Sequence, residues 1–111
     1  MLDKEKRICK SRDFKNSYKI GKKIPGRYII VFVTGNKLGC NRFGIVTSKK
    51  VGKAVVRNKA KRQIRAIINN QEKQIKTGYD IVIVVRQKIT AAVFALIEKD
   101  FRIVMRKANL C

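Results

Sequence analysis

Histidine is absent from this chain, and acidic residues are scarce. The 111 residues include no His, seven Asp or Glu and 28 Lys or Arg, which gives a formal net charge of +21. Without histidine, a protein nuclease would need paired carboxylates as its general base and metal ligands. The acids are scattered, without a DxD arrangement: Asp3, Glu5, Asp13, Glu72, Asp80, Glu98 and Asp100. We therefore expect no catalytic residue and no metal site in this polypeptide.

Cysteine pairs and long apolar runs are also missing. Cys9, Cys40 and Cys111 are far apart and form no CxxC motif, so we expect reduced thiols rather than disulfides or a zinc site. No apolar run approaches the ~18 residues of a membrane-spanning helix, and no signal-type stretch follows the basic N-terminus. These absences predict a soluble, cytoplasmic protein with no membrane partner.

The cations are concentrated in the first two thirds of the chain. No acid occurs between Asp13 and Glu72, whereas fifteen Lys or Arg residues do. A field of one sign favours nucleic acid over small ligands. The length suits one domain, so we expect a single nucleic-acid-binding domain over residues 1–111, with residues 1–10 as a basic, flexible tail.

The densest cationic stretch, residues 49–65 (KKVGKAVVRNKAKRQIR), holds eight Lys or Arg and no acid. At 100° per residue, one arc of about 120° collects Ala60, Ile64, Ile67 and Ile68, and the opposite side collects Asn58, Lys61, Arg62 and Arg65. The pattern predicts a helix, continuing to about residue 70, with one face on a core and a cationic outer face. Arg57, Lys61 and Arg65 recur at every fourth position, which places a charge roughly every 6 Å along one line.

Shorter patterns predict the other elements. Ser11 suits the N-cap of a helix that ends with Gly21 at the C′ position, and Pro25-Gly26 indicates a turn. Runs of β-branched and aromatic residues predict strands at 27–34, 42–48 and 79–86. We expect the first two to pair antiparallel and the last two to form a parallel βαβ unit. Thr90 is expected to cap a final helix, whose core face holds Phe94, Ile97, Phe101, Val104 and Met105.

Two groups of side chains are candidates for binding. Arg57, Arg62 and Arg65 can each hold a phosphate through two hydrogen bonds, and Asn58 can bond to a phosphate, base or 2′-hydroxyl. Phe14 and Tyr18 share one face of the predicted first helix. Two interpretations of these rings stay open: they pack on the sheet, or they lie partly exposed where unpaired bases stack, at about 1–3 kcal/mol each.

The run VGKAVVRNKAKRQIR closely resembles the signature of the bacterial ribonuclease P protein subunit, Gly-x-Ala-x-x-Arg-Asn-Arg-x-Lys-Arg-x-x-Arg. The matching residues are Gly52, Ala54, Arg57, Asn58, Lys61, Arg62 and Arg65, and the preceding Ser48-Lys49-Lys50 also fits the family. Lys59 stands where the family usually has arginine, which keeps the charge but not the planar fork. The likeness extends over nearly the whole chain through Asp13-Phe14, Tyr18, Gly21, Tyr79-Asp80 and Arg86.

The resemblance implies a fold and a function. The fold is a two-layer α/β sandwich, roughly α-β-β-β-α-β-α in order, with about four strands and a left-handed βαβ crossover, against the usual right-handed rule. The function is that of a subunit that joins a catalytic RNA to remove the 5′ leader from precursor tRNA. The RNA performs the phosphodiester hydrolysis and mainly holds the Mg²⁺. No protein partner is predicted.

The resemblance also assigns residues to two faces. The catalytic RNA would contact Lys49, Lys50, Gly52, Lys53, Arg57, Asn58, Lys59, Lys61, Arg62 and Arg65. The single-stranded leader would lie in a cleft between the first helix and the sheet, near Phe14, Tyr18 and Arg86. Family members often place an aromatic on the first strand in that cleft. Val31 or Phe32 holds this place, depending on a register of one residue.

Two other classes of protein stay open. A ribosomal or other structural RNA-binding protein would use the same charge and helix without an associated reaction. A DNA-binding protein would insert the helix into the major groove, although its exposed face offers many phosphate binders and few base readers.

Overall fold

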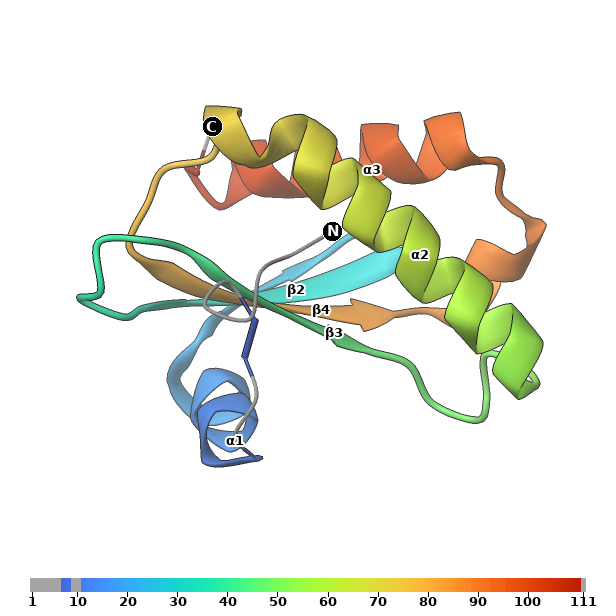
Figure 1. The fold of residues 1–111 in the computed structure, drawn as a ribbon, viewed down its shortest axis with the longest axis horizontal. Coiled ribbons are helices and arrows are strands. Elements are labelled where there is room, and N and C mark those ends of the chain that lie inside the picture. The colour runs from blue at the N-terminus through green and yellow to red at the C-terminus, as the bar shows by residue number, and fades with distance from the viewer. Residues whose placement is uncertain (1–6, 9–10, 111) are drawn as a thin grey trace.

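A computed structural model describes residues 7–8 and 11–110 of the chain. Three α-helices and four strands follow one another in the predicted α-β-β-β-α-β-α order, with two short 3₁₀ segments (Figure 1). The elements are α1 (Ser11–Ile20), β1 (Lys22–Pro25), β2 (Ile29–Gly35), β3 (Arg42–Val46), α2 (Ala54–Gln71), η2 (Glu72–Gln74), β4 (Tyr79–Val85), η3 (Gln87–Ala91) and α3 (Phe94–Lys107). The prediction of an α/β fold with a four-stranded sheet is confirmed.

The strands form one mixed sheet in the order β1-β2-β4-β3. β3 and β4 pair in parallel, as the βαβ pattern predicts, and the left hand of that crossover stays a prediction. The expected antiparallel pairing of β2 with β3 is wrong, because β4 lies between them and pairs antiparallel with β2. β4 (YDIVIVV) is the most apolar strand, and a central position removes both of its backbone edges and both of its faces from water.

The sequence patterns did not identify β1 as a strand. Lys22, Lys23 and Pro25 are exposed, and only Ile24 of this strand is buried. A short edge strand with lysines and a proline blunts the open edge of the sheet, and it lacks the apolar alternation by which strands are recognised.

The two faces of the sheet have different covers. α2 and α3 lie on one face and α1 lies on the other (Figure 1). Ile29, Val31 and Val33 of β2 are buried in the core with α2 and α3. Because side chains alternate along a strand, Phe32 faces α1, where its ring meets that of Tyr18. Phe32, and not Val31, therefore lies on the α1 side.

The end of α1 and the start of α3 are formed by interactions other than the expected ones. Gly21 follows α1, but it is not among the residues of positive φ. A side chain there would instead collide with the Ser17 carbonyl and lie 2.9 Å from the Thr34 hydroxyl. The prediction that Thr90 caps α3 is wrong, since Val93 is the N-cap residue and the Thr90 hydroxyl donates to the Gln87 carbonyl, 3.1 Å away, within η3.

Asp100 has a structural role that the sequence analysis missed. Its carboxylate, on the buried side of α3, accepts hydrogen bonds from the backbone N–H groups of Arg27 (3.0 Å) and Tyr28 (2.8 Å). These bonds join the turn between β1 and β2 to α3. Spacing within a helix cannot reveal a partner that lies more than seventy residues away in the sequence.

The described part of the N-terminal segment is attached to the sheet. Arg7 forms a parallel bridge with Phe43, and the backbone N–H of Ile8 donates to the Phe43 carbonyl at 3.0 Å. Ile8 is only 6% exposed. These two residues therefore pair with β3, and the rest of residues 1–10 lies outside the described part of the chain, so the flexible tail stays a prediction.

Candidate nucleic-acid interface

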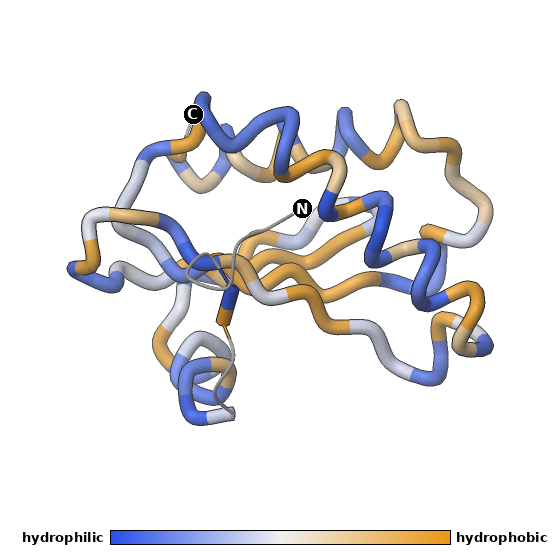
Figure 2. Tube along the Cα trace, in the orientation of Figure 1, coloured by the Kyte–Doolittle hydropathy of each residue, from blue (hydrophilic) through white to orange (hydrophobic). Residues whose placement is uncertain are grey.

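The predicted cationic helix is present as α2, and its core face is the predicted one. Its buried residues are Ala60, Ile64, Ile67 and Ile68. Figure 2 shows hydrophilic and apolar segments alternating along α2, while the strands of the sheet are mainly apolar. Asn58, Lys59, Arg62 and Arg65 are exposed, and Lys61 is half-buried. The burial of one stripe thus seats the helix and turns its cations to solvent.

Arg57 lies on the core side of α2, at the N-terminal end of the helix. Its side chain is half-buried, and its Nε atom is enclosed without a hydrogen-bond partner. On the helical wheel it falls within the arc of buried residues, between Ile64 and Ile68. The Arg57 stem therefore packs beside the core, which leaves the outer part of its guanidinium group as the part available to a ligand.

The segment before α2 presents three further lysines. Val51 is buried and anchors the segment, and backbone bonds from Val51 to Ser48 and from Gly52 to Lys49 fold it into a turn. Gly52 has φ +148°, a conformation that residues with a side chain rarely adopt. Lys49, Lys50 and Lys53 are exposed around this anchored turn.

Within residues 7–8 and 11–110, the cations of residues 49–65 form no ion pair with a carboxylate. Among the described residues, the ion pairs observed are those of Arg42 with Asp13 and Asp80, and neither involves α2 or the turn before it. The first turn of α2 contains no acid, and no side chain caps its N-terminus. This surface is therefore suited to a polyanion, which would relieve the repulsion among its cations.

The face of the sheet beneath α1 carries aromatic rings. The Tyr18 and Phe32 rings meet edge to face, with centroids 5.0 Å apart and an interplanar angle of 84°. Tyr18 is 41% exposed, and partial burial raises the pKa of its phenol. Phe14 is half-buried on Gly44, where an added Cβ would lie 2.5 Å from the Phe14 ring. The rings pack on the sheet and still expose area, so the stacking of bases on them stays a prediction.

Arg86 does not join this aromatic cluster. It follows the end of β4, and its backbone N–H donates to the Tyr28 carbonyl at 2.9 Å. Its Nη1 atom donates to the Gly26 carbonyl at 2.9 Å. The half-buried side chain is therefore held against the β1–β2 turn, at the end of the sheet beyond Phe32 and Val82.

A hollow of about 150 Å³ connects the two predicted interfaces at the edge of the sheet formed by β3. Its walls come from the N-terminal segment, α1, β3 and α2: Arg7, Ile8, Phe14, Phe43, Gly44, Ile45, Lys61 and Arg65. Phe14 was predicted to bind one RNA and Lys61 and Arg65 another. Local sequence patterns do not indicate that residues so far apart in the chain share one opening.

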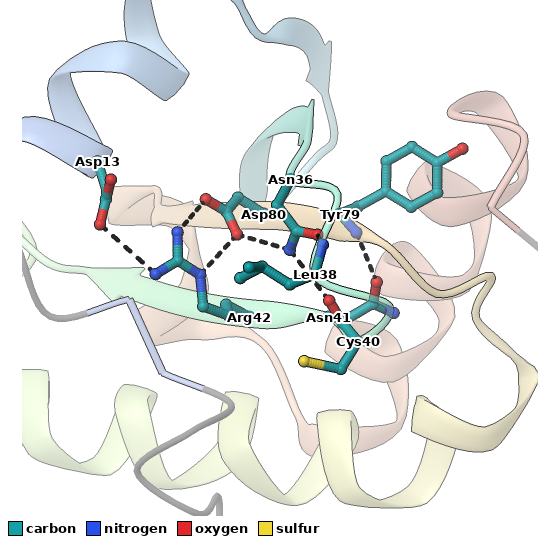
Figure 3. A network of polar contacts seen from close by, with 8 residues as sticks. All are labelled: Asp13, Asn36, Leu38, Cys40, Asn41, Arg42, Tyr79 and Asp80. Atoms are coloured by element: carbon teal, nitrogen blue, oxygen red, sulfur yellow. Dashed lines mark hydrogen bonds and ion pairs between the residues drawn. The ribbon is translucent and has the colours of Figure 1, made fainter.

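A polar network fixes β3, β4 and α1 relative to one another (Figure 3). Arg42 donates from Nε and Nη2 to the two carboxylate oxygens of Asp80, at 2.9 and 2.6 Å. Asn36 donates to the same carboxylate at 2.9 Å. Burial by itself raises the pKa of Asp80, but the bonds from Arg42 and Asn36 and the Arg42 charge outweigh it, so this pKa lies below its usual value.

The described residues offer no metal site. In residues 7–8 and 11–110, no three His, Cys, Asp or Glu side chains gather where they could hold an ion. Cys40 is exposed and free, while Cys9 and Cys111 lie outside the described residues. No helix in this part of the chain has the length and apolar character needed to cross a membrane.

These features define a small, basic α/β protein with a cationic helix on one side of its sheet and an aromatic surface on the other. A family model described as ribonuclease P matches residues 2–109. The ribonuclease P protein component of Syntrophomonas wolfei is 46% identical over 110 residues, which cover 99% of this chain and 92% of that protein.

Solved structures agree with this match. A Staphylococcus aureus RNase P protein mutant with defective mRNA degradation activity superimposes with a TM-score of 0.91 at 34% identity, covering 97% of this chain and 92% of that one. The Thermotoga maritima RNase P protein superimposes with a TM-score of 0.84 at 31% identity, covering 91% of this chain and 96% of that one. The chain therefore belongs to the ribonuclease P protein family. It acts as the protein subunit of ribonuclease P in tRNA processing, which decides against the ribosomal and DNA-binding alternatives.

The Asp80 network predicts a specific acid response. A pKa that is lower in the folded chain stabilises the fold above the unfolded value of about 3.9, and this stabilisation disappears as the pH falls through the folded-state pKa. We expect Asp80→Asn to lower the free energy of unfolding by about 2 kcal/mol at neutral pH, because bonds to a charged group are lost. The difference from wild type should shrink below about pH 4.

Urea denaturation at a series of pH values measures this difference. Glu98→Gln is the matched control, since Glu98 only accepts long bonds from Asn70 and Gln71, at 3.4 and 3.5 Å. A difference for Asp80→Asn that stays constant from neutral to acidic pH would show that the carboxylate charge is irrelevant.

Proposed function

We propose that this subunit binds two RNAs on two adjoining surfaces. The α2 surface, with the turn before it, binds the catalytic RNA of ribonuclease P, and the surface between α1 and the sheet binds the 5′ leader of precursor tRNA. The observation that carries this proposal is the hollow at the β3 edge, which has Phe14 of one surface and Lys61 and Arg65 of the other in its walls. Two RNAs held there would meet at one place on the protein.

The α2 surface suits a folded RNA because the helix is firmly seated and its cations form no ion pair in the described part of the chain. Four fully or almost fully buried residues hold the helix on the core, so its cations keep fixed spacings that can match successive phosphates. Arg62 and Arg65 add the planar fork that binds phosphate with two hydrogen bonds. Each neutralised phosphate releases counterions, which makes such binding strongly dependent on salt.

The surface beneath α1 suits a single strand. Tyr18, Phe14 and Phe32 present partly exposed rings on which unpaired bases can stack in any sequence. Lys23 on β1 is exposed, and side-chain alternation places it on the same face as Phe32, its partner across the strands. A duplex could not place its stacked bases against these rings.

We assign the hydrolytic chemistry, and the Mg²⁺ that supports it, mainly to the RNA subunit. The chain contains no histidine. Two of its carboxylates are committed within the fold, Asp80 to Arg42 and Asn36, and Asp100 to two backbone N–H groups. The part of this protein is then to hold the two RNAs, and no proton transfer or metal ligation is required of its side chains.

Arg62→Ala should weaken binding to the catalytic RNA and make it less sensitive to salt. Loss of one phosphate contact should lower the slope of log K against log salt by about one unit. Filter binding or fluorescence titration over a range of KCl concentrations measures this slope. Arg106→Ala, which removes an exposed arginine of α3, is the control and should leave the slope unchanged. An unaltered slope for Arg62→Ala would exclude a direct phosphate contact.

Tyr18→Ala and Phe14→Ala should each weaken binding of precursor tRNA to the holoenzyme by about 1–3 kcal/mol, because a base loses its stacking partner. Binding of mature tRNA, which lacks the leader, should not change. Ile20→Ala is the control, since Ile20 lies on the same helix and is 63% exposed. Equal losses for precursor and mature tRNA would mean that the rings serve only to pack α1.

A further inference from the structure

α1 is attached to the sheet by few contacts. Ser17 is its one buried residue, and Tyr18 and Ile20 are both well exposed. α1 nevertheless supplies Phe14 and Tyr18, two of the three rings on the leader surface. The spacing between these rings and the sheet therefore depends on whatever fixes a loosely packed helix.

Arg42 lies where it can fix the position of α1 relative to the sheet. The alternation of β3 turns Phe43 into the core and Arg42 and Gly44 toward α1. The Nε and Nη2 atoms of Arg42 hold both oxygens of Asp80 on the neighbouring strand. This bidentate pair sets the plane of the guanidinium group, and its remaining nitrogen, Nη1, lies 3.5 Å from a carboxylate oxygen of Asp13 on α1.

Asp13 directly precedes Phe14 in the first turn of α1. The ion pair to Arg42 and the contact of Phe14 with Gly44 thus hold the same end of the helix to the same strand. At the other end, Gly21 lies close to Thr34 of β2, where an added Cβ would come within 2.9 Å of the Thr34 hydroxyl. Figure 3 shows Arg42 between the two carboxylates, one on α1 and one on the sheet.

We propose that Arg42 is a positioning residue for the leader: clamped by Asp80, it holds Asp13 and thereby keeps α1, with Phe14 and Tyr18, at a fixed distance above the sheet. The inference rests on the proposed binding of the leader to this surface. It assigns Arg42 to the interior framework of the site and not to the phosphates, although it is one of the basic residues of a strongly cationic chain.

When Asp13 loses its charge by substitution, an electrostatic role and a positioning role predict opposite changes in RNA affinity. Asp13→Asn raises the formal net charge from +21 by one, so a purely electrostatic effect would tighten binding to any RNA. Loss of positioning would instead weaken binding of the leader and leave the affinity for the catalytic RNA unchanged or slightly higher. Asp13 is partly exposed and Asp80 keeps its pair with Arg42 in this variant, so the fold should persist.

The experiment compares Asp13→Asn with Asp13→Glu, which retains the carboxylate, and with Glu98→Gln, which changes the charge equally on α3. Hydrogen exchange of the free proteins reports the attachment of α1. Holoenzymes reconstituted with the catalytic RNA are then titrated with precursor tRNA and with the same tRNA lacking its leader. The ratio of these two affinities isolates the contribution of the leader.

We expect Asp13→Asn to speed exchange in α1 but not in α2 or β4, and to lower the affinity ratio about two- to fivefold, the range of an exposed ion pair. Asp13→Glu should recover much of the loss, and Glu98→Gln should match wild type. An unchanged or higher ratio, or unchanged exchange in α1, would overturn the role of Arg42 while leaving the leader surface intact. A wild-type ratio of one would instead refute the proposed leader binding itself.

Discussion

Two buried carboxylates, those of Asp80 and Asp100, connect segments of this fold that are distant in the sequence. Asp80 neutralises Arg42 at the β3–β4 pair, and Asp100 holds the β1–β2 turn through two backbone N–H groups. Both carboxylates are buried, and both act inside the fold. The cationic residues 49–65 are left without an acid among them. These two carboxylates are engaged inside the fold, and the repulsion among the α2 cations would be relieved by the RNA that we propose α2 binds.

The two faces of the sheet are covered to different extents. α2 and α3 bury one face completely enough to form the core, whereas the single, loosely packed α1 leaves rings on the other face partly exposed. The edge strand β3 contacts both sides: the Phe43 side chain packs in the core, while the Arg42 side chain and the backbone of Gly44 lie on the α1 side. A small protein can in this way offer the two unlike surfaces that we propose bind RNA.

Local patterns in the sequence predicted the elements whose burial is regular. The stripe of Ala60, Ile64, Ile67 and Ile68 and the apolar run of β4 were enough to find α2, the central strand and the cationic face. The predictions that failed concern features that depend on contacts distant in the sequence or that have weak local signals. β1 has one buried residue, β4 inserts between β2 and β3, and Thr90 lies in a 3₁₀ segment before the helix it was expected to cap. The choice of Phe32 over Val31 needed the actual register, since one residue reverses the face.

The division of the protein into two RNA surfaces can be tested by covalent footprinting. Acylation of Lys59 and oxidation of Tyr18, both exposed in the free protein, are measured after adding the catalytic RNA alone and again after adding precursor tRNA. The account predicts protection of Lys59 by the catalytic RNA alone, and protection of Tyr18 only when a precursor with its leader is added. Protection of Tyr18 by the catalytic RNA alone, or equally by tRNA without a leader, would contradict it.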